Sequence, residues 1–505
     1  MMTLVESAPV VQSDGLKTLR NYIDGQWVEA ESRGYLEVET PSSGQVLAKI
    51  PLSTDSDVDR AVLAARLAFP SWSQTPVSNR VQPLFKLVEC LRRDEVQIAR
   101  VLTEEMGKSL SDARAELKRS VENVEVACAM PTLMQDDSVL DCGSGIDGEV
   151  MRMPVGVFCA ITPFNFPSMA PFWFLPYAVV YGNTFVLKCS ERVPITMQLY
   201  FEMFQECGFP PGVVNLVNGD QTASQALIRH PDVDGISFVG STHVAKIVAE
   251  TCAREGKRCQ ALGSAKNYLV VMSDAKLDQV VRNILTSCLG CAGQRCIAAS
   301  AIACVGDEVY EEVVRRFTQQ VKQTLVANPL DPEHADEELA VGPAISSAAN
   351  QRIENLIQQG INEAARIVLD GRQKQVKDNK VGYYVGSTAL TEVKPGITVE
   401  KTELFGPVVI FMKFASLDDA ISAVNEHEFG NGASIYMQNG YGARKFKTEV
   451  RAGMIGVNVG IPAPMAYMPF GGKKDHIRAD LKTQSKESVS FFTEKKIVTE
   501  RYWPE

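Results

Sequence analysis

Short apolar runs alternate with amphipathic stretches along most of the chain. Apolar runs of strand length lie at 155–162, 184–188, 235–239, 268–272, 299–305, 408–414 and 454–459. Most of them are separated by stretches whose apolar residues recur at helical spacing, including 244–254, 277–289 and 308–325. Strands and helices that alternate in this way predict an α/β fold with parallel sheets.

One more helix is predicted near the beginning of the chain, over 56–69. Its apolar residues recur at helical spacing, at Val58, Ala61, Val62, Ala65 and Phe69. Ser56 comes just before this pattern and Asp59 lies three residues later, which is the spacing of a capping box. The helix is therefore expected to begin at Ser56.

Two segments depart from the alternation. Residues 139–153 contain three closely spaced glycines and predict a hairpin outside the succession of sheet strands. Residues 488–503 are rich in β-formers with alternating polarity and predict a strand at the end of the chain. Both segments would leave strand edges without partners, which favours assembly with a second copy.

Length, composition and charge narrow the class of protein. A chain of 505 residues with 45% hydrophobic and 22% charged residues is expected to form several globular domains. The net charge of -10 argues against a protein that binds nucleic acid or an anionic membrane. No leader pattern and no apolar stretch of bilayer length is visible, so a cytoplasmic location is expected.

The cysteines and histidines indicate free thiols and no metal site. Twelve cysteines are spread from Cys90 to Cys304 without the dense spacing of a disulfide scaffold, which is typical of a reducing compartment. Cys288 and Cys291 form a CxxC pair, but neither a second pair nor suitably spaced histidines accompany it. A metal centre is therefore not expected.

Cys296 is a candidate nucleophile. It follows Gly293, Gln294 and Arg295, and a neighbouring cation favours the reactive thiolate. The glycine would let the backbone approach a ligand closely. For any one of twelve cysteines, a buried structural thiol is the commoner explanation, so this pattern needs support from elsewhere.

Polar residues at the ends of three predicted strands provide that support. Asn165 lies between two prolines after the strand 155–162, where its amide could donate to an oxyanion. Lys188 ends the next strand, Glu191 follows it, and the two could bind the hydroxyls of a sugar. Gly240 and Ser241 form a turn into a helix, a place for a phosphate or nicotinamide group. Ligands of open α/β sheets bind at these strand ends.

These motifs, taken in order, resemble the aldehyde dehydrogenase superfamily over nearly the whole chain. They are ITPFNFP (161–167), VLKCSE (186–191), FVGS (238–241), GQRC (293–296), ELFGP (403–407) and PFGG (469–472). The resemblance implies a Rossmann-type NAD-binding domain (1–133 and 154–264) and an α/β catalytic domain (265–465). It also implies a small β oligomerisation element (134–153 and 480–505), in a homodimer or homotetramer.

The resemblance also implies roles for individual residues. Cys296 would attack an aldehyde carbonyl to form a thioester, and Asn165 with the Cys296 backbone N–H would hold the oxyanion. Lys188 and Glu191 would bind the adenosine ribose of NAD, and Glu191 would repel the extra phosphate of NADP. Glu403 would bind the nicotinamide ribose. The remaining cofactor residues would be Thr162, Phe164, Arg192, Ser241 and Phe405.

One departure from the superfamily points to coenzyme A as a co-substrate. Hydrolytic members carry a glutamate that activates water, and here Ala261 is interpreted as the residue at that position. Loss of a general base typically costs ~10²–10⁴ in rate, so hydrolysis is expected to be poor. The surrounding residues 260–267 and 462–466 resemble the methylmalonate- and malonate-semialdehyde dehydrogenases, which pass the acyl group to coenzyme A. Decarboxylation would then give propanoyl-CoA or acetyl-CoA.

A semialdehyde substrate needs a partner for its carboxylate. Arg295 is one candidate, since a guanidinium pairs bidentately with a carboxylate. Arg119 matches the second carboxylate arginine of the resembled group, although Glu116 and Glu122 nearby would equally fit a solvated helix face. Cys288 and Cys291 are interpreted as core residues, with a protective disulfide to Cys296 as the alternative.

Two other functions remain open at this level. The same scaffold could oxidise a different aldehyde, by hydrolysis or acylation, which a requirement for coenzyme A would distinguish. The chain could also be a non-catalytic NAD-binding relative. Against that second alternative, Cys296, Asn165, Lys188, Glu191 and Glu403 are all present.

Overall fold

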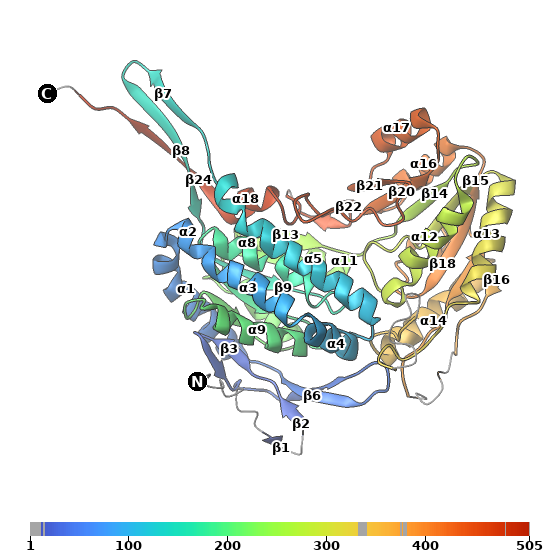
Figure 1. Cartoon of the computed structure of the whole chain (residues 1–505), viewed down its shortest axis with the longest axis horizontal. Helices are drawn as coiled ribbons and strands as arrows, with labels where there is room; N and C mark the ends of the chain where they lie inside the picture. Colours follow the sequence, from blue (N-terminus) through green and yellow to red (C-terminus); the bar gives the residue numbers. More distant parts are fainter. Residues whose placement is uncertain are drawn as a thin grey trace.

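Two separate, mostly parallel sheets contain the apolar runs of the sequence (Figure 1). The computed structural model describes residues 12–13, 16–331, 341–373, 376, 381–479 and 481–503. The predicted strands over 184–188, 235–239 and 408–414 are confirmed at their bounds, and the remaining four are confirmed with ends shifted by a few residues.

The first sheet has eight strands, in the order β23-β13-β12-β9-β10-β11-β3-β4. Its five inner strands are parallel, and antiparallel strands close both edges. The strands are β3 (Asn21–Ile23), β4 (Gln26–Val28), β9 (Val157–Ile161), β10 (Thr184–Lys188), β11 (Val214–Leu216), β12 (Gly235–Val239), β13 (Arg258–Leu262) and β23 (Ile477–Arg478).

Helices cover both faces of this sheet, because its strands are apolar on both sides. One face packs against α3 (Gln82–Arg93), α5 (Leu110–Cys128), α8 (Leu175–Val180) and α9 (Ile195–Cys207). The other face packs against α1 (Asp55–Gln74), α10 (Gln221–Arg229) and α11 (Thr242–Arg254). The helix α4 (Glu95–Met106) lies against α5 and α9.

The second sheet has seven strands, in the order β16-β17-β18-β15-β14-β20-β21. They are β14 (Tyr268–Val271), β15 (Ala301–Val305), β16 (Arg366–Leu369), β17 (Thr388–Thr391), β18 (Val408–Phe414), β20 (Gly432–Tyr436) and β21 (Met454–Val457). One face packs against α12 (Leu277–Leu289) and α13 (Asp307–Val321). The other packs against α14 (Ser347–Asn362), α15 (Thr398–Lys401), α16 (Leu417–Glu426) and α17 (Gly440–Glu449).

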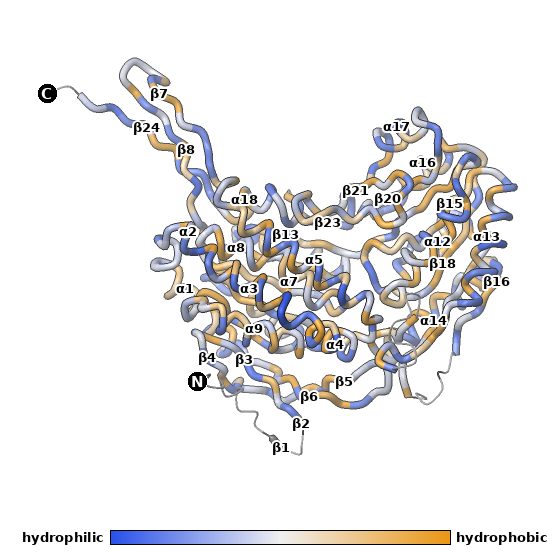
Figure 2. Tube along the Cα trace, viewed as in Figure 1, coloured by the Kyte–Doolittle hydropathy of each residue, from blue (hydrophilic) through white to orange (hydrophobic). Residues whose placement is uncertain are grey.

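A three-stranded antiparallel arm projects from the body (Figure 1). It consists of β7 (Ser138–Gly143), β8 (Ile146–Pro154) and β24 (Thr493–Glu500), so the predicted hairpin and C-terminal strand pair with each other. Figure 2 shows both polar and apolar residues along the arm. Among the described helices, none combines the length and apolar character needed to span a bilayer.

The remaining elements are short. A small four-stranded sheet contains β1 (Gln12–Ser13), β2 (Leu16–Thr18), β5 (Tyr35–Glu39) and β6 (Val46–Pro51). A two-stranded sheet pairs β19 (Phe429–Gly430) with β22 (Lys473–Lys474). The short helices are α2 (Val77–Arg80), α6 (Met130–Leu133), α7 (Met169–Phe172) and α18 (Glu487–Phe492).

Several other predicted element bounds were wrong. The helix predicted over 308–325 ends at Val321. The capping box of α1 is formed by Thr54 and Asp57, two residues before the predicted pair, and the helix continues past Pro70. Packing keeps its last turn helical, because Trp72 donates its indole N–H to the Val179 carbonyl at 2.9 Å. At the other end of the chain, residues 488–492 are helical because α18 buries Phe491 and Phe492 against Phe158.

We predict that Phe492→Ala loosens the base of the arm. Phe492 is 1% exposed, and its ring centroid lies 4.8 Å from that of Phe158 in β9. Truncating a buried phenylalanine typically costs about 3–5 kcal/mol. A lower Tm and faster proteolysis within β24 are expected, measured beside Phe85→Ala, whose side chain is exposed. A variant that melts and resists protease like the parent would contradict this anchoring role.

Candidate active site

Cys296 lies in an irregular loop between α12 and β15. The loop begins with a 3₁₀ turn (Gly290–Gly293) in which Cys291 and Ala292 have φ of 51° and 53°. Gly293 is needed there, since a Cβ at this position would lie 2.0 Å from the Gly406 carbonyl oxygen. The side chains of Asn267 and Asn431 donate to the Cys296 carbonyl at 3.0 and 2.9 Å. The backbone that carries the thiol is therefore held from two sides.

Two cavities meet at Cys296. The larger has a volume of about 710 Å³ and lies at the carboxyl ends of β9, β10 and β12. The smaller has a volume of about 310 Å³ and lies beside α5. Cys296, Phe166 and Trp173 line both cavities. A thiol at this boundary can be approached by different ligands from its two sides.

Most of the predicted site residues line these cavities. The larger cavity is lined by Thr162, Phe164, Asn165, Lys188, Glu191, Ser241, Glu403 and Phe405, and the smaller by Arg119 and Arg295. Arg192 is the exception: its side chain is exposed, and it is absent from the lining of the larger cavity. The turn after β10 directs Glu191 inward and Arg192 toward solvent.

Asn165 links the loop of residues 162–168 to the loop that carries Cys296. Its side-chain nitrogen donates to the Gln294 carbonyl at 2.9 Å, and the residue is 4% exposed. An amide nitrogen carries two hydrogens, so one remains available to a ligand in the larger cavity. This arrangement suits a donor to a developing oxyanion on a carbonyl attacked by Cys296.

Lys188 and Glu191 form an ion pair at the edge of the first sheet. The distance from Lys188 Nζ to Glu191 Oε2 is 3.0 Å. Burial acts to raise the pKa of Glu191, but the Lys188 ammonium holds it below its ordinary value. The pair therefore presents a charged donor and a charged acceptor, which suits two adjacent hydroxyl groups.

Glu403 faces the cavity from the second sheet. One carboxylate oxygen accepts the Ala265 backbone N–H at 3.1 Å, and Arg352 donates to the Glu403 carbonyl at 2.8 Å. Burial raises the pKa of Glu403 to about 7, so its carboxyl group is part-protonated near neutral pH. Phe405 has a φ of 52° and packs edge-on against Phe164, with ring centroids 5.8 Å apart.

The Cys296 thiol is protonated at neutral pH. Burial raises its pKa to about 12, and the Glu403 carboxylate contributes in the same direction. The Cys296 backbone N–H and Arg295 act in the opposite direction but do not outweigh burial. A further positive charge near the thiol would be needed to populate the thiolate.

Both predicted carboxylate-binding arginines already have acidic partners. Arg295 forms a partly buried ion pair with Asp112 of α5. Arg119 is about one-third exposed, and its Nη1 lies 2.7 Å from Glu122 Oε2 and 2.8 Å from the Met465 sulfur. A substrate carboxylate would share these guanidinium groups with the protein's own carboxylates.

The interpretation of Ala261 as the residue in place of a base needs correction. Its side chain belongs to the apolar cluster between the first sheet and α1, α10 and α11. The neighbouring Leu262 points to the opposite face and belongs to the cluster against which Cys296 packs. Successive strand residues alternate between faces, so Leu262, and not Ala261, lies on the face of the sheet whose cluster includes Cys296 at its border. Like Ala261, it has no group that accepts a proton.

Sequence reasoning did not identify several polar residues around the loop. Asn267, Asn431 and Gln294 bind its backbone, and Lys108 with Glu116 binds the Asn165 segment. The available signal for the two asparagines was a polar residue directly before an apolar strand. Nothing local distinguishes Lys108 and Glu116 from surface charges.

The cysteines near Cys296 in the sequence are packed in the interior. Cys288 is 1% exposed and its sulfur contacts the Ala299 carbonyl. Cys291 is 3% exposed and clusters with Met106 and Val193. All twelve cysteines are free thiols in this structure. These contacts fit the interpretation as core residues, while a disulfide formed under oxidation stays a prediction.

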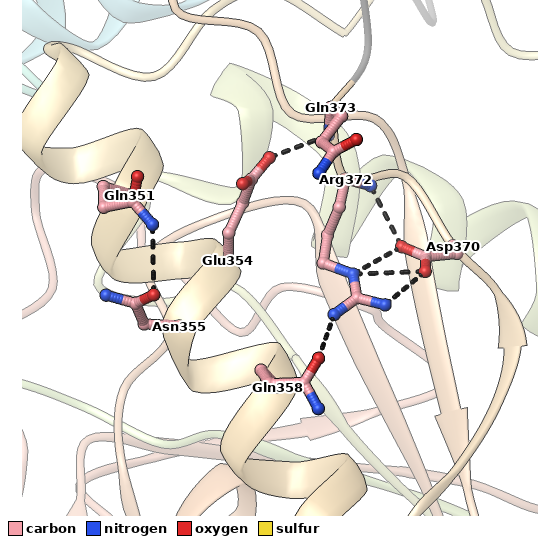
Figure 3. Close-up of a pocket in the computed structure, with 7 residues that line it drawn as sticks. All are labelled: Gln351, Glu354, Asn355, Gln358, Asp370, Arg372 and Gln373. Atoms are coloured by element: carbon pink, nitrogen blue, oxygen red, sulfur yellow. Dashed lines mark hydrogen bonds and ion pairs between the residues drawn. The ribbon is translucent and has the colours of Figure 1, made fainter.

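A separate polar pocket of about 450 Å³ lies between α14 and the segment after β16 (Figure 3). Its charged groups bind one another: Arg372 contacts Asp370 and donates to Gln358 at 2.7 Å. Gln373 donates its backbone N–H to Glu354 at 2.8 Å. None of the predicted site residues lines it.

The chain is similar to known proteins over nearly its full length. It is 43% identical to a malonate-semialdehyde dehydrogenase of Geobacillus kaustophilus over 96% of this chain and 98% of the relative. A methylmalonate-semialdehyde dehydrogenase structure from Oceanimonas doudoroffii superimposes with a TM-score of 0.93, at 38% identity over 97% and 99% of the two chains.

A second structure has a cofactor bound. It is a protein assigned as a methylmalonate-semialdehyde dehydrogenase from Sinorhizobium meliloti, in complex with NAD. The TM-score is 0.94, at 36% identity over 98% of this chain and 99% of that one. The family model for the aldehyde dehydrogenase family matches residues 27–498. The predicted resemblance and fold class are confirmed, and this chain belongs to the aldehyde dehydrogenase family.

Proposed function

We propose that this protein is a coenzyme A-acylating dehydrogenase of malonate or methylmalonate semialdehyde that uses NAD. The observation that supports it most directly is the placement of Cys296 between two cavities of different character. One has the Lys188–Glu191 pair, and the other has Arg119 and Arg295. The relatives named for these semialdehydes support the same substrate class.

The larger cavity fits NAD. Its Lys188–Glu191 pair suits the adenosine ribose, and the carboxylate of Glu191 disfavours a 2′-phosphate, hence NAD over NADP. Glu403 faces the same cavity and would bind the second ribose. When bound, NAD supplies the acceptor for two electrons and the hydrogen of the aldehyde carbon. In this proposal residues 1–133 and 154–264 form the NAD-binding unit, and residues 265–465 the catalytic unit.

The smaller cavity fits a short aldehyde with a carboxylate. Trp173 and Phe470 form one apolar wall, with ring centroids 4.5 Å apart, and Arg119 and Arg295 supply positive charge. The substrate carboxylate would bind the guanidinium donors while its aldehyde carbon reaches Cys296. Asp112 and Glu122 keep the arginines ordered before the substrate arrives.

Cys296 would then form the covalent intermediates, and Asn165 would donate a hydrogen bond to the oxyanion. The Cys296 sulfur attacks the aldehyde carbon, and the oxyanion is held by the Asn165 amide and the Cys296 backbone N–H. After oxidation, the acyl group is a thioester on Cys296. Its carbonyl accepts the electron pair released when the C2–carboxylate bond breaks, carbon dioxide leaves, and C2 takes a proton. The coenzyme A sulfur then attacks the thioester carbonyl and releases the Cys296 thiol.

The residues near Cys296 favour a thiol over water as the acyl acceptor. Leu262 lies on the same side of the sheet as Cys296 and has no proton acceptor, and Glu116 and Asp112 in the smaller cavity are bound to Lys108 and Arg295. Coenzyme A needs less help than water, because a thiol ionises closer to neutral pH. A second candidate function is slow hydrolysis of the thioester, with Glu403 as the base that activates water. The raised pKa of Glu403, about 7, favours this role.

The arm is proposed as the oligomerisation element of a homodimer or homotetramer. Its apolar side chains are exposed in the single chain: Leu140 is 77% exposed and Ile497 is 75% exposed. Apolar residues at the edge of a sheet are normally covered by another element.

We predict that steady-state formation of NADH from either semialdehyde requires coenzyme A. Without it the Cys296 thioester would accumulate after one turnover, because no base near Leu262 assists water. NADH absorbance, followed with and without coenzyme A, measures this. Cys296→Ala should abolish both burst and turnover, whereas Cys142→Ala, in the exposed arm, should retain them. Equal turnover without coenzyme A would instead support hydrolysis, to be tested with Glu403→Gln.

We predict that Leu262→Glu introduces NADH turnover that is independent of coenzyme A. The new carboxyl would face the cluster against which Cys296 packs and could deprotonate water. Ala261→Glu is the matched control, since its carboxyl would enter the core beneath α1 and α11. That variant should lose stability and gain no such turnover. Gain of hydrolysis in Ala261→Glu rather than Leu262→Glu would reverse the assignment of faces.

We predict that alkylation of Cys296 by iodoacetamide without NAD rises about tenfold per pH unit from pH 7 to 10. Burial raises the thiol pKa to about 12, so the thiolate fraction increases through this whole window instead of levelling off near pH 9. Peptide mass spectrometry would follow Cys296, with exposed Cys142 as an internal reference. NAD should accelerate the reaction at pH 7, because its nicotinamide ring is positively charged. A plateau near pH 8 without NAD would disprove the raised pKa.

A further inference from the structure

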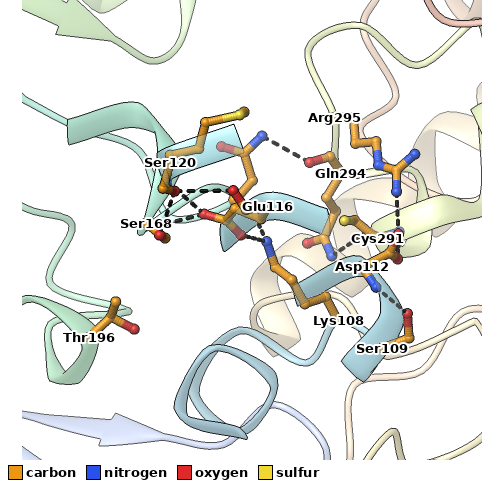
Figure 4. Close-up of polar contacts among 12 residues, drawn as sticks. Lys108, Ser109, Asp112, Glu116, Ser120, Ser168, Thr196, Cys291, Gln294 and Arg295 are labelled. Atoms are coloured by element: carbon orange, nitrogen blue, oxygen red, sulfur yellow. Dashed lines mark hydrogen bonds and ion pairs between the residues drawn. The ribbon is translucent and has the colours of Figure 1, made fainter. Parts of the chain in front are cut away.

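A buried ion pair contacts the loop of residues 162–168, which carries Asn165 (Figure 4). The side chains of Lys108, between α4 and α5, and Glu116, within α5, are both fully buried and contact each other. Lys108 Nζ also donates to the Asn165 carbonyl at 2.7 Å and lies 4.6 Å from the centre of the Phe166 ring. The ammonium group therefore binds the backbone of the residue whose amide faces the cavity.

Glu116 binds the same loop from its other end. One carboxylate oxygen accepts the backbone N–H groups of Ser168 and Met169, at 2.8 and 3.0 Å. The other oxygen contacts Lys108. Residues 162–168 contain two prolines and form no regular strand or helix, so these bonds satisfy backbone groups that the loop itself does not pair.

Asp112, one turn before Glu116 on α5, binds the loop that carries Cys296. Its carboxylate accepts the Cys291 backbone N–H at 2.8 Å and pairs with Arg295. Figure 4 shows Asp112 and Glu116 directed toward the two loops from the same helix. The Cys291 bond supports a turn with φ of 51° and 53° at two non-glycine residues, a conformation that costs about 1–2 kcal/mol per residue.

We propose that Lys108, Glu116 and Asp112 are positioning residues, which set the Asn165 amide relative to Cys296. This inference rests on the proposed function, because it concerns the oxyanion that forms during attack on the aldehyde. Residues on one helix are held rigidly relative to one another. The distance between the two loops is thereby defined by α5 instead of by the flexible loops themselves.

Stability alone does not account for two charges at this depth. Moving an ammonium and a carboxylate out of water costs several kcal/mol each, and apolar residues of similar size often serve equally well. Burial acts to lower the pKa of Lys108, yet Glu116 raises it above the ordinary value, so the lysine stays charged. What the ions provide, and apolar residues do not, is three hydrogen bonds to the backbone of one catalytic loop. A displacement of about 1 Å at such a site can cost about 10²-fold in rate.

The test is a double-mutant cycle on the NADH burst without coenzyme A. The variants are Lys108→Met, Glu116→Gln and Lys108→Met/Glu116→Gln, each also combined with Asn165→Ala. We expect the burst rate constant to fall about 10- to 100-fold in each Lys108 or Glu116 variant, with KM for aldehyde and NAD within about threefold of the parent. In the Asn165→Ala background the same substitutions should cause little further loss, because the amide they position is gone.

Controls separate positioning from general destabilisation. Lys474→Met removes another part-buried ammonium, which donates to the Val424 and His427 carbonyls at 2.9 Å, and it should lower Tm without affecting the burst. Lys108→Met leaves the buried Glu116 without its partner. If this variant does not fold, the inference is tested with Glu116→Gln and the double variant. An unchanged burst, or an equal loss with and without Asn165, would overturn the inference. Absence of any burst in the parent enzyme would instead overturn the proposed function.

Discussion

The loops around Cys296 are buried but irregular, so their backbone polar groups must find partners among side chains. An unpaired buried N–H or C=O group costs about 1–3 kcal/mol, and these loops contain several such groups. Asn267 and Asn431 satisfy the Cys296 carbonyl, while Lys108 satisfies that of Asn165. Each partner belongs to a regular element or lies directly beside one. The precision of the site therefore derives from helices and strands, although the reacting groups lie on loops.

The same burial determines the electrostatics of the site. It raises the pKa of Cys296 to about 12 and that of Glu403 to about 7, so the two groups nearest the chemistry are predominantly or partly neutral. The charges that remain, on Lys188, Glu191 and Arg295, are each compensated by a direct partner. Such a site has little net charge of its own. The charge of an incoming ligand therefore has a large effect on the ionisation of the thiol.

Much of the fold was predictable because its strands are short apolar runs bounded by polar residues. The strands at 184–188, 235–239 and 408–414 have this form, and the residues that follow Ile161, Lys188 and Val239 meet at one sheet edge. The face occupied by Ala261 and Leu262 was not predictable, since it depends on pairing with β12. The partners of Lys108 and Glu116 come from a loop about fifty residues later in the chain, which no local pattern indicates.

The position of β24 has a consequence for synthesis of the chain. Thr493 pairs with Pro154 and Glu500 with Asp147, so the arm joins segments more than three hundred residues apart. The first sheet is likewise closed at one edge by β23, from residues 477–478. While the ribosome is still translating, β8 and β13 each have one edge without a partner. Their completion waits for the synthesis of residues 477–500, and termination before these residues would leave strands of both sheets exposed to aggregation.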